Sequence, residues 1–339
     1  MNANRALRLA VVGLGLVATI SGTAAKFHQA KIFFQNETLL IGYELERTVG
    51  IVQLFHSTNP VAKSADWKFA KLAPGDSSLH GSFNISSYSQ ANDTGYFQLR
   101  TVEWKAPAAF VWIQPGGYLM GSPDTEAERF TDEGPQHHVT VDSGFWLSQY
   151  EVTQKKYQSI TGFNPSRAQG LPDNPVENIS WVEAMDYCRR LNQAAMNAGK
   201  LPQGYEFRLP TEEEWEYACR AGTTTAYSYG DDVEDLSEHG WYADNSGSTP
   251  SPVGSKKPNP WGLYDMHGNV FEWCYTRYKA YPGGKIRNLS IDYRAVRSGA
   301  FICPPTILRS ATRFESAPAV SRSWLTGFRV ALAPIIEGH

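Results

Sequence analysis

The chain has 339 residues, of which 42% are apolar and 13% aromatic, enough for two ordinary domains with a sizeable core. Its formal net charge is −3, and basic and acidic residues are interspersed along the sequence. This pattern provides no basic patch for a nucleic acid or an anionic membrane surface, so neither is expected as a partner.

The first 25 residues are predicted to be a secretory signal peptide. Arg5 and Arg8 precede the uncharged run LAVVGLGLVATISGTAA, which ends in small residues before Lys26. A transmembrane anchor is the alternative, but the run is short and contains three glycines. No cysteine ends the run to accept a lipid, and no later segment is long and apolar enough to span a bilayer. We therefore expect a secreted or periplasmic protein with no integral membrane segment after cleavage.

Residues 26–105 are predicted to form a small all-β sandwich of the immunoglobulin or fibronectin type III kind. Short apolar runs alternate with turn-rich connections, which is typical of antiparallel strands. The runs are KIFF, ETLLIGYEL, GIVQLFHST and GYFQLRTVEW, separated by stretches such as PGDSSLHGS and SQANDTG. This region contains no recognisable catalytic constellation.

Residues 106–336 form the second predicted domain, in which two helices can be read. The first follows Ser180 and ends at Gly199, and its apolar residues Val182, Met185, Cys188 and Leu191 recur at helical spacing. The second begins after Thr211, where Glu214 completes a capping box, and ends at Gly222. The remainder is predicted to consist of short strands and loops.

An ordered series of motifs runs through this second domain. The motifs are FVWIQPGGYLMGS (110–122), EGPQHHVTV (133–141), QYEVTQKKY (149–157), NPVENISWVEAMDYC (174–188), RLPTEEEWEYACRAG (208–222), PNPWGLYDMHGNVFEW (258–273) and GFRVAL (327–332). In this order and spacing they resemble the sulfatase-modifying-factor family, the formylglycine-generating-enzyme domain. The resemblance covers about residues 108–334 and does not extend to residues 26–105.

The resemblance implies an α+β domain related to C-type lectins, poor in regular secondary structure and stapled by calcium. Active members of the family oxidise a cysteine of a sulfatase to formylglycine with O₂ and a copper(I) ion held by two cysteines. Other members are inactive paralogues or binding proteins. Because one fold hosts these different roles, the resemblance alone does not decide the function.

A calcium site is predicted in the stretch GLYDMHGNVFEW. Calcium prefers six to eight oxygen ligands, and this stretch carries two carboxylates with a glycine between them that lets the chain turn. The resemblance places the ligands at the side chains of Asp265 and Glu272 and at the carbonyls of Gly268 and Val270. A second calcium site is implied at Asn245 and Ser246, although the loop that would complete it is shortened to SGSTPS.

The four cysteines, Cys188, Cys219, Cys274 and Cys303, lack the spacing of a zinc site. Cys303 in SGAFIC stands at the position of the first copper cysteine of the family. Five residues later, where the family has its second, the chain has Leu308, and Ala300 replaces a serine of the active centre. Copper(I) prefers two sulfur ligands, so copper is not expected. The favoured interpretation of Cys303 is a small apolar filler beneath a loop. It stays a catalytic candidate only, because Arg309 and Arg313 could lower its pKa.

The favoured interpretation is a secreted, calcium-stabilised binding or accessory module. Its predicted ligand surface is the loop 300–326, with Phe301, Ile302, Phe314, Trp324, Arg309 and Arg313, and its partner would be a protein, peptide or glycan. The alternative is a formylglycine-generating oxidase whose partner is a sulfatase. Whether the protein is an enzyme therefore stays open, with the missing cysteine speaking against it. Cys188 and Cys219 are expected to be buried and free, because the partner positions that relatives use are Val330 and Ser310 here.

Overall fold

The computed structural model describes residues 106–286, 293–318 and 321–336 in full or in backbone, together with the strand backbones that lie between Ala6 and Val102. The chain divides into two compact units, residues 1–107 with 202–204, and residues 108–201 with 205–339. None of the helices among the described residues combines the length and apolar character needed to cross a bilayer.

The described residues of the first unit form eight antiparallel strands in two sheets. One sheet has the order β2-β1-β8-β5-β6 and the other β3-β4-β7. The strands are β1 (Ala6–Val12), β2 (Gly15–Thr19), β3 (Phe27–Gln35), β4 (Thr38–Leu45), β5 (Ile51–Ser57), β6 (Lys68–Pro74), β7 (His80–Asn84) and β8 (Gly95–Val102). All four runs predicted as strands are found in strands. A separate sandwich domain, and the signal peptide within which β1 and β2 fall, stay predictions.

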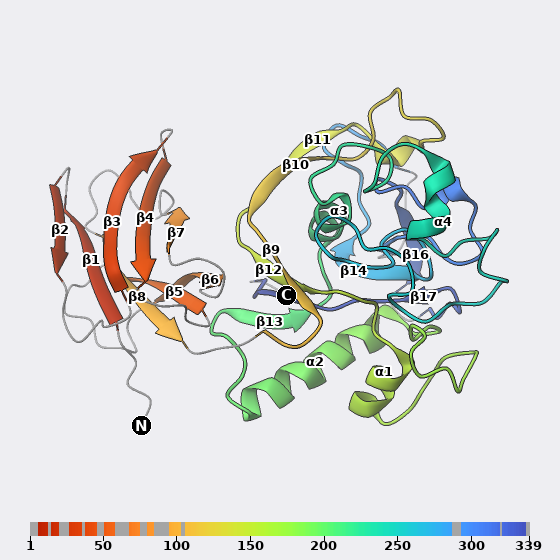
Figure 1. The fold of residues 1–339 in the computed structure, drawn as a ribbon, viewed down its shortest axis with the longest axis horizontal. Helices are drawn as coiled ribbons and strands as arrows, with labels where there is room; N and C mark the ends of the chain where they lie inside the picture. Colours follow the sequence, from red (N-terminus) through yellow and green to blue (C-terminus); the bar gives the residue numbers. More distant parts are fainter. Residues whose placement is uncertain are drawn as a thin grey trace. The chain divides into compact units, whose positions relative to one another are not determined.

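The second unit is an α+β domain with modest regular structure, as predicted. Its sheets have the orders β13-β18-β12-β9, β16-β15-β14-β17 and β10-β11. Their strands are β9 (Phe110–Ile113), β10 (Gly116–Met120), β11 (His137–Val141), β12 (Phe145–Ser148), β13 (Tyr205–Arg208), β14 (Phe271–Arg277), β15 (Tyr293–Arg297), β16 (Phe314–Pro318), β17 (Thr326–Gly327) and β18 (Ala331–Pro334). Short 3-10 turns lie at Thr131–Glu133, Val233–Asp235 and Pro305–Ile307. Long loops connect these elements (Figure 1).

Helices α1 (Gln154–Thr161) and α2 (Trp181–Asn197) pack against each other (Figure 1). The predicted start of α2 is confirmed, because Ser180 and Glu183 form a capping box. The predicted buried face is wrong at Val182, which is 48% exposed. The face is set instead by Tyr187, whose ring stacks on Tyr157 of α1 at a centroid distance of 5.5 Å.

Helix α3 (Glu212–Arg220) lies in the core of the second unit, and α4 (Leu236–His239) is a single turn. Thr211 and Glu214 form the predicted capping box of α3. The apolar residues Trp215, Ala218 and Cys219 pack into the main core, which also includes residues of the sheets around it. The acidic residues of the same helix are also largely buried, which requires cationic partners from elsewhere in the chain.

Candidate functional site

Three buried carboxylates lie near one guanidinium, that of Arg329, beside the predicted calcium loop. Glu272 forms a bidentate ion pair with Arg329, with Nε to Oε2 and Nη2 to Oε1 both at 2.6 Å. The indole of Trp215 also donates to Glu272 Oε2, at 2.7 Å. Glu151 and Asp265 are the other two acids, and neither forms an ion pair with Arg329 within the described residues. The site therefore carries more negative than positive charge.

Burial raises the pKa of two of these acids, and the neighbouring negative charges add to the rise. Burial, with a smaller contribution from Glu272, raises the pKa of Asp265 to about 6. Burial and then the charges of Asp265 and Glu272 raise the pKa of Glu151 well above its ordinary value. One oxygen of Asp265, Oδ1, is buried and has no hydrogen-bond partner among the described residues, whereas Oδ2 accepts from the Gly254 amide at 2.7 Å. An unpaired buried carboxylate oxygen is a ready ligand for a hard cation.

The backbone of the loop 265–270 is shaped around this position. Asp265, Gly268 and Asn269 all have positive φ, at 58°, 128° and 67°. A side chain at Gly268 would place a Cβ 2.2 Å from the carbonyl oxygen of Trp241, so only glycine fits. The amide of Val270 donates to Glu151 Oε1 at 3.1 Å. Glu151 therefore fixes the loop, a role that the sequence analysis missed although the motif QYEVTQKKY contains it.

These residues fit calcium in part. Asp265 offers an unpaired oxygen, and the loop carries the carbonyls of Gly268 and Val270. Both oxygens of Glu272, however, are engaged by Arg329 and Trp215. No group of three or more His, Cys, Asp or Glu side chains forms a metal site within the described ranges, so backbone carbonyls would have to complete the coordination. The calcium site stays a prediction.

The predicted second calcium site has its polar groups engaged locally. The side-chain oxygen of Asn245 accepts from the Tyr242 amide at 2.9 Å, and its nitrogen donates to the Gly240 carbonyl at 2.9 Å. The Ser246 carbonyl accepts from Thr249 at 3.3 Å. These contacts close the loop without a cation, and calcium here also stays a prediction.

Cys303 borders an aromatic cluster. It packs against the buried group of Ala226, Tyr227, Leu236, Tyr242 and Leu308. Leu308, at the position of the family's second copper cysteine, is fully buried, as is Ala300. Burial raises the pKa of the Cys303 thiol above its ordinary value of 9.0. This packing agrees with the favoured interpretation of Cys303 as an apolar filler, and the alternative of a thiol activated by arginines finds no support.

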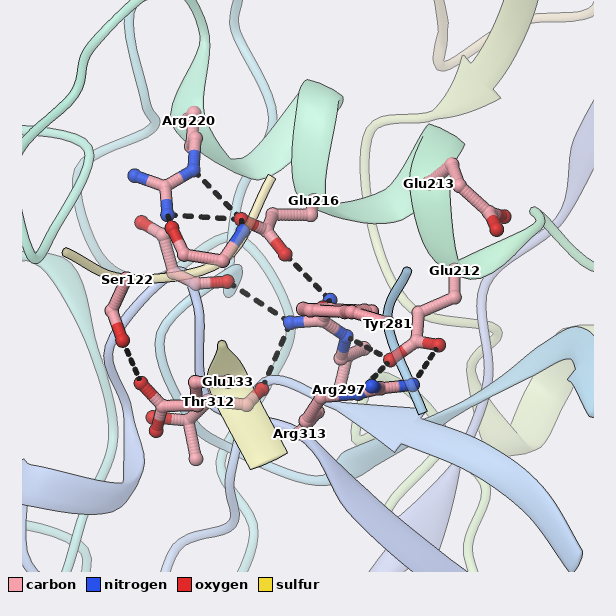
Figure 2. Close-up of polar contacts among 12 residues, drawn as sticks. Ser122, Glu133, Glu212, Glu213, Glu216, Arg220, Tyr281, Arg297, Thr312 and Arg313 are labelled. Atoms are coloured by element: carbon pink, nitrogen blue, oxygen red, sulfur yellow. Dashed lines mark hydrogen bonds and ion pairs between the residues drawn. The ribbon is translucent and has the colours of Figure 1, made fainter. Parts of the chain in front are cut away.

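Both arginines that could have lowered that pKa are buried in ion pairs. Arg309 contacts Glu133 through Nη2 and Oε1 at 2.6 Å, and it also pairs with Glu126. Arg313 forms a bidentate pair with Glu212. Figure 2 shows the Arg313 pair beside Arg297, which bonds to both Glu212 and Glu216. The placement of Arg309 on a ligand surface is wrong, because two carboxylates hold its charge in the interior.

The residues of the predicted ligand surface do not form one continuous surface in the structure. Phe301 is fully buried, so its assignment to the surface is wrong, and it packs under the ring of Trp324 at 5.4 Å. Ile302 and Trp324 are exposed, at 38% and 37%. Phe314 lies instead in a groove of about 480 Å³.

This groove combines aromatic rings with charges of both signs, and we call it the Phe130 groove. Its lining comprises Phe130, Thr131, Asp132, Tyr278, Lys285, Ile286, Arg313, Phe314 and Glu315. The Phe130 and Phe314 rings meet edge to face at 6.0 Å, and the Tyr278 hydroxyl donates to Asp132. The volume lies in the range of small-molecule and peptide pockets. This groove was not predicted from the sequence, because its walls come from three segments that are far apart in the chain.

Comparison with known proteins decides the family. Residues 97–334 match the family described as the sulfatase-modifying factor enzyme 1-like domain. The chain belongs to the FGE-sulfatase family. The match covers all the motifs identified in the sequence.

Family relatives carry different names. The chain is 31% identical to the chaperone protein LppX of Paenibacillus barcinonensis over 200 residues, which are 46% of this chain and 68% of that protein. It is also 31% identical to the formylglycine-generating enzyme of Streptomyces coelicolor over 237 residues, 61% of this chain and 70% of that one. The match to the serine/threonine-protein kinase pkn1 of Chlamydia caviae, 31% identical over 65% of this chain, spans 37% of the kinase. Membership therefore does not fix the activity.

A solved structure supports the fold assignment. The structure of Treponema denticola variable protein 1 aligns with a TM-score of 0.56 and 28% identity, covering 66% of this chain and 95% of that one. The FGE-sulfatase fold of the second unit is thus established from both sequence and structure. The expectation that Cys188 and Cys219 are buried and free is also confirmed.

Proposed function

We propose that this FGE-sulfatase family protein is a secreted or periplasmic binding or accessory module, stabilised by calcium, that does not generate formylglycine. The observation that carries the proposal is the fully buried Leu308 at the position of the second copper cysteine. A cuprous ion needs a second sulfur, and a leucine side chain offers no ligand atom. The raised pKa of Cys303 further reduces the thiolate available to bind a soft metal.

The Phe130 groove supports a binding role, with a peptide segment of a protein as the ligand. Lys285 contributes positive charge, and Asp132 and Glu315 contribute negative charge, whereas Glu212 compensates the charge of Arg313. Such a lining complements a peptide that carries both charges, while the rings of Phe130 and Phe314 accept apolar side chains. The N-terminal strands, if they form a separate sandwich, would be a spacer or a second binding domain.

The decisive experiment is an anaerobic copper(I) titration of the full chain, followed by an aldehyde assay on a sulfatase peptide. We expect neither stoichiometric tight binding nor aldehyde. The double variant Ala300→Ser with Leu308→Cys supplies the missing groups, and we expect it to bind copper(I) more tightly than the parent. Tight copper binding with aldehyde formation by the parent chain would overturn the proposal.

Binding is tested with a random peptide library displayed on phage. Phe130→Ala should reduce binding of the selected peptides at least tenfold, and Phe163→Ala, an exposed phenylalanine outside the groove, should not. If no peptide were selected, or if the two variants reduced binding equally, the Phe130 groove would not be the peptide-binding site.

The alternative function is a formylglycine-generating oxidase that acts on a sulfatase. The 31% identity to the Streptomyces coelicolor enzyme over 61% of this chain favours it. The same copper and aldehyde measurements distinguish the two functions.

A further inference from the structure

A second pocket, independent of the Phe130 groove, lies on helix α1. It has a volume of about 370 Å³ and is lined by the exposed side of α1 and by the loop 164–172. On the helix, Lys155 and Ser159 are separated by one turn, as are Gln154 and Gln158, so all four belong to one side. None of the groups assigned to calcium, copper or the Phe130 groove lines this pocket.

The floor of the pocket is rigid. Gln154 is buried, and its amide donates to the Ala168 carbonyl at 2.9 Å. Its side-chain oxygen accepts from Asn164 at 2.9 Å. The backbone amides of Gln154 and Lys155 donate to the carbonyls of Asn174 and Pro172. These bonds tie the start of α1 to the loop, so a ligand would meet a preformed surface.

Groups above the floor remain available to a ligand. Lys155, Gln158 and Ser159 are exposed, and the Ser159 hydroxyl donates to the backbone carbonyl of Lys156 at 2.7 Å. A carboxamide both donates and accepts, and a hydroxyl oxygen keeps accepting capacity. Gly170 has a φ of +82°, and a Cβ there would meet nothing within 4 Å, so this side of the pocket is open.

The chemistry of the lining selects the class of ligand. Carboxamides and a hydroxyl match a molecule that presents several hydroxyl groups, each of which donates and accepts. Leu171, 41% exposed, and Pro172 provide an apolar patch for a C–H face. Lys155 is the one ionisable group in the lining, which disfavours cationic ligands and tolerates acidic ones.

We propose that this pocket binds a saccharide unit, neutral or carrying a carboxylate. The sugar ring would lie with its apolar face on Leu171 and its hydroxyl groups toward Gln158 and Ser159. A carboxylate, where present, would face Lys155. This inference does not rest on the proposed peptide-binding function, because the two sites share no residue.

The test is saturation-transfer-difference NMR on the full chain with cellotetraose, chitotetraose and tetragalacturonic acid as probes, and tetraalanine as the peptide control. We expect saturation of ring protons for at least one sugar and none for tetraalanine. The double variant Gln158→Ala with Leu171→Ala should reduce the signal at least fivefold. Gln193→Ala, an exposed glutamine on α2, should leave it unchanged.

Two further variants distinguish acidic from neutral sugars, and this pocket from the Phe130 groove. Lys155→Ala should weaken only the response to tetragalacturonic acid. The response should persist in Phe130→Ala, so failure of the groove proposal leaves this result intact. Absence of saturation for all three sugars, an equal loss in Gln193→Ala, or saturation of tetraalanine alone would overturn the saccharide site.

Discussion

Glu212 and Arg313 form a bidentate ion pair between the first residue of α3 and the chain 101 residues later, with Nε–Oε1 at 2.8 Å and Nη2–Oε2 at 2.6 Å. Both side chains are buried. Glu212 Oε1 also accepts from Arg297 Nε at 3.0 Å, so one carboxylate compensates two guanidinium groups (Figure 2). Removing its charge would leave both arginines under-compensated in the interior.

Glu212→Gln should therefore destabilise the protein by about 3 to 5 kcal/mol. Urea unfolding measures the change in the free energy of unfolding. The adjacent Glu213→Gln is the matched control, because Glu213 is only partly buried and forms no ion pair within the described part of the chain; it should change stability by less than about 1 kcal/mol. If the two variants changed the free energy of unfolding equally, the buried ion pair would not be the cause of the loss of stability.

Calcium should raise the melting temperature of the full chain. A ligand at 100 times its dissociation constant stabilises the folded state by about 2.7 kcal/mol. Asp265→Asn should abolish most of that increase, since it removes the unpaired carboxylate oxygen, whereas Asp142→Asn, at an exposed position, should retain it. Differential scanning fluorimetry with EDTA and with added calcium makes the measurement. If EDTA-treated parent chain showed no calcium-dependent shift, the predicted site would be refuted.

The Cys303 thiol should react slowly with iodoacetamide at neutral pH. Its pKa is raised, so the reactive thiolate is scarce at pH 7 and increases as the pH rises past 9. The other three thiols are buried and should stay unmodified until urea unfolds the chain. Mass spectrometry of tryptic peptides follows each site. Rapid labelling of Cys303 at pH 7 would indicate an activated thiol instead.

Ser310→Cys should create a disulfide with Cys219. The Ser310 side chain lies close enough to the Cys219 thiol to offset part of the rise in its pKa, so the two positions are neighbours in the core. A disulfide that closes a loop of this length typically stabilises by about 2 to 4 kcal/mol. The bond is detected as a mass loss after oxidation together with a higher melting temperature. The combined variant Cys219→Ser with Ser310→Cys should show neither change.

Local features of the fold could be predicted well. The starts of α2 and α3 depend on a hydroxyl cap and a glutamate three residues later, and both caps have the predicted geometry. The motif series also identified the family, because the loops it encodes depend on particular residues such as Gly268. Such signals lie within a few residues of one another and need no knowledge of the rest of the chain.

The candidate ligand surface was predicted less well. Phe301 and Arg309 were placed on it because an aromatic and a basic residue in a loop are usually exposed, yet both are buried. The reason is tertiary: Glu133, 176 residues earlier, supplies the charge that makes burial of Arg309 possible. The Phe130 groove went unnoticed for the same reason, because Phe130 and Phe314 become neighbours only in the folded chain.

By itself the sequence determined the family, the two capped helices and the absence of a second thiol five residues after Cys303, since each is a matter of which residues follow one another. Only the tertiary structure decided which charged side chains form ion pairs and which keep an unpaired atom that a ligand could contact. That outcome depends on distances between residues far apart in the chain, and it left Asp265 with an unpaired oxygen while enclosing Arg309 and Arg313 in ion pairs. Electrostatic energy follows spatial separation and burial, and neither is written in the order of residues.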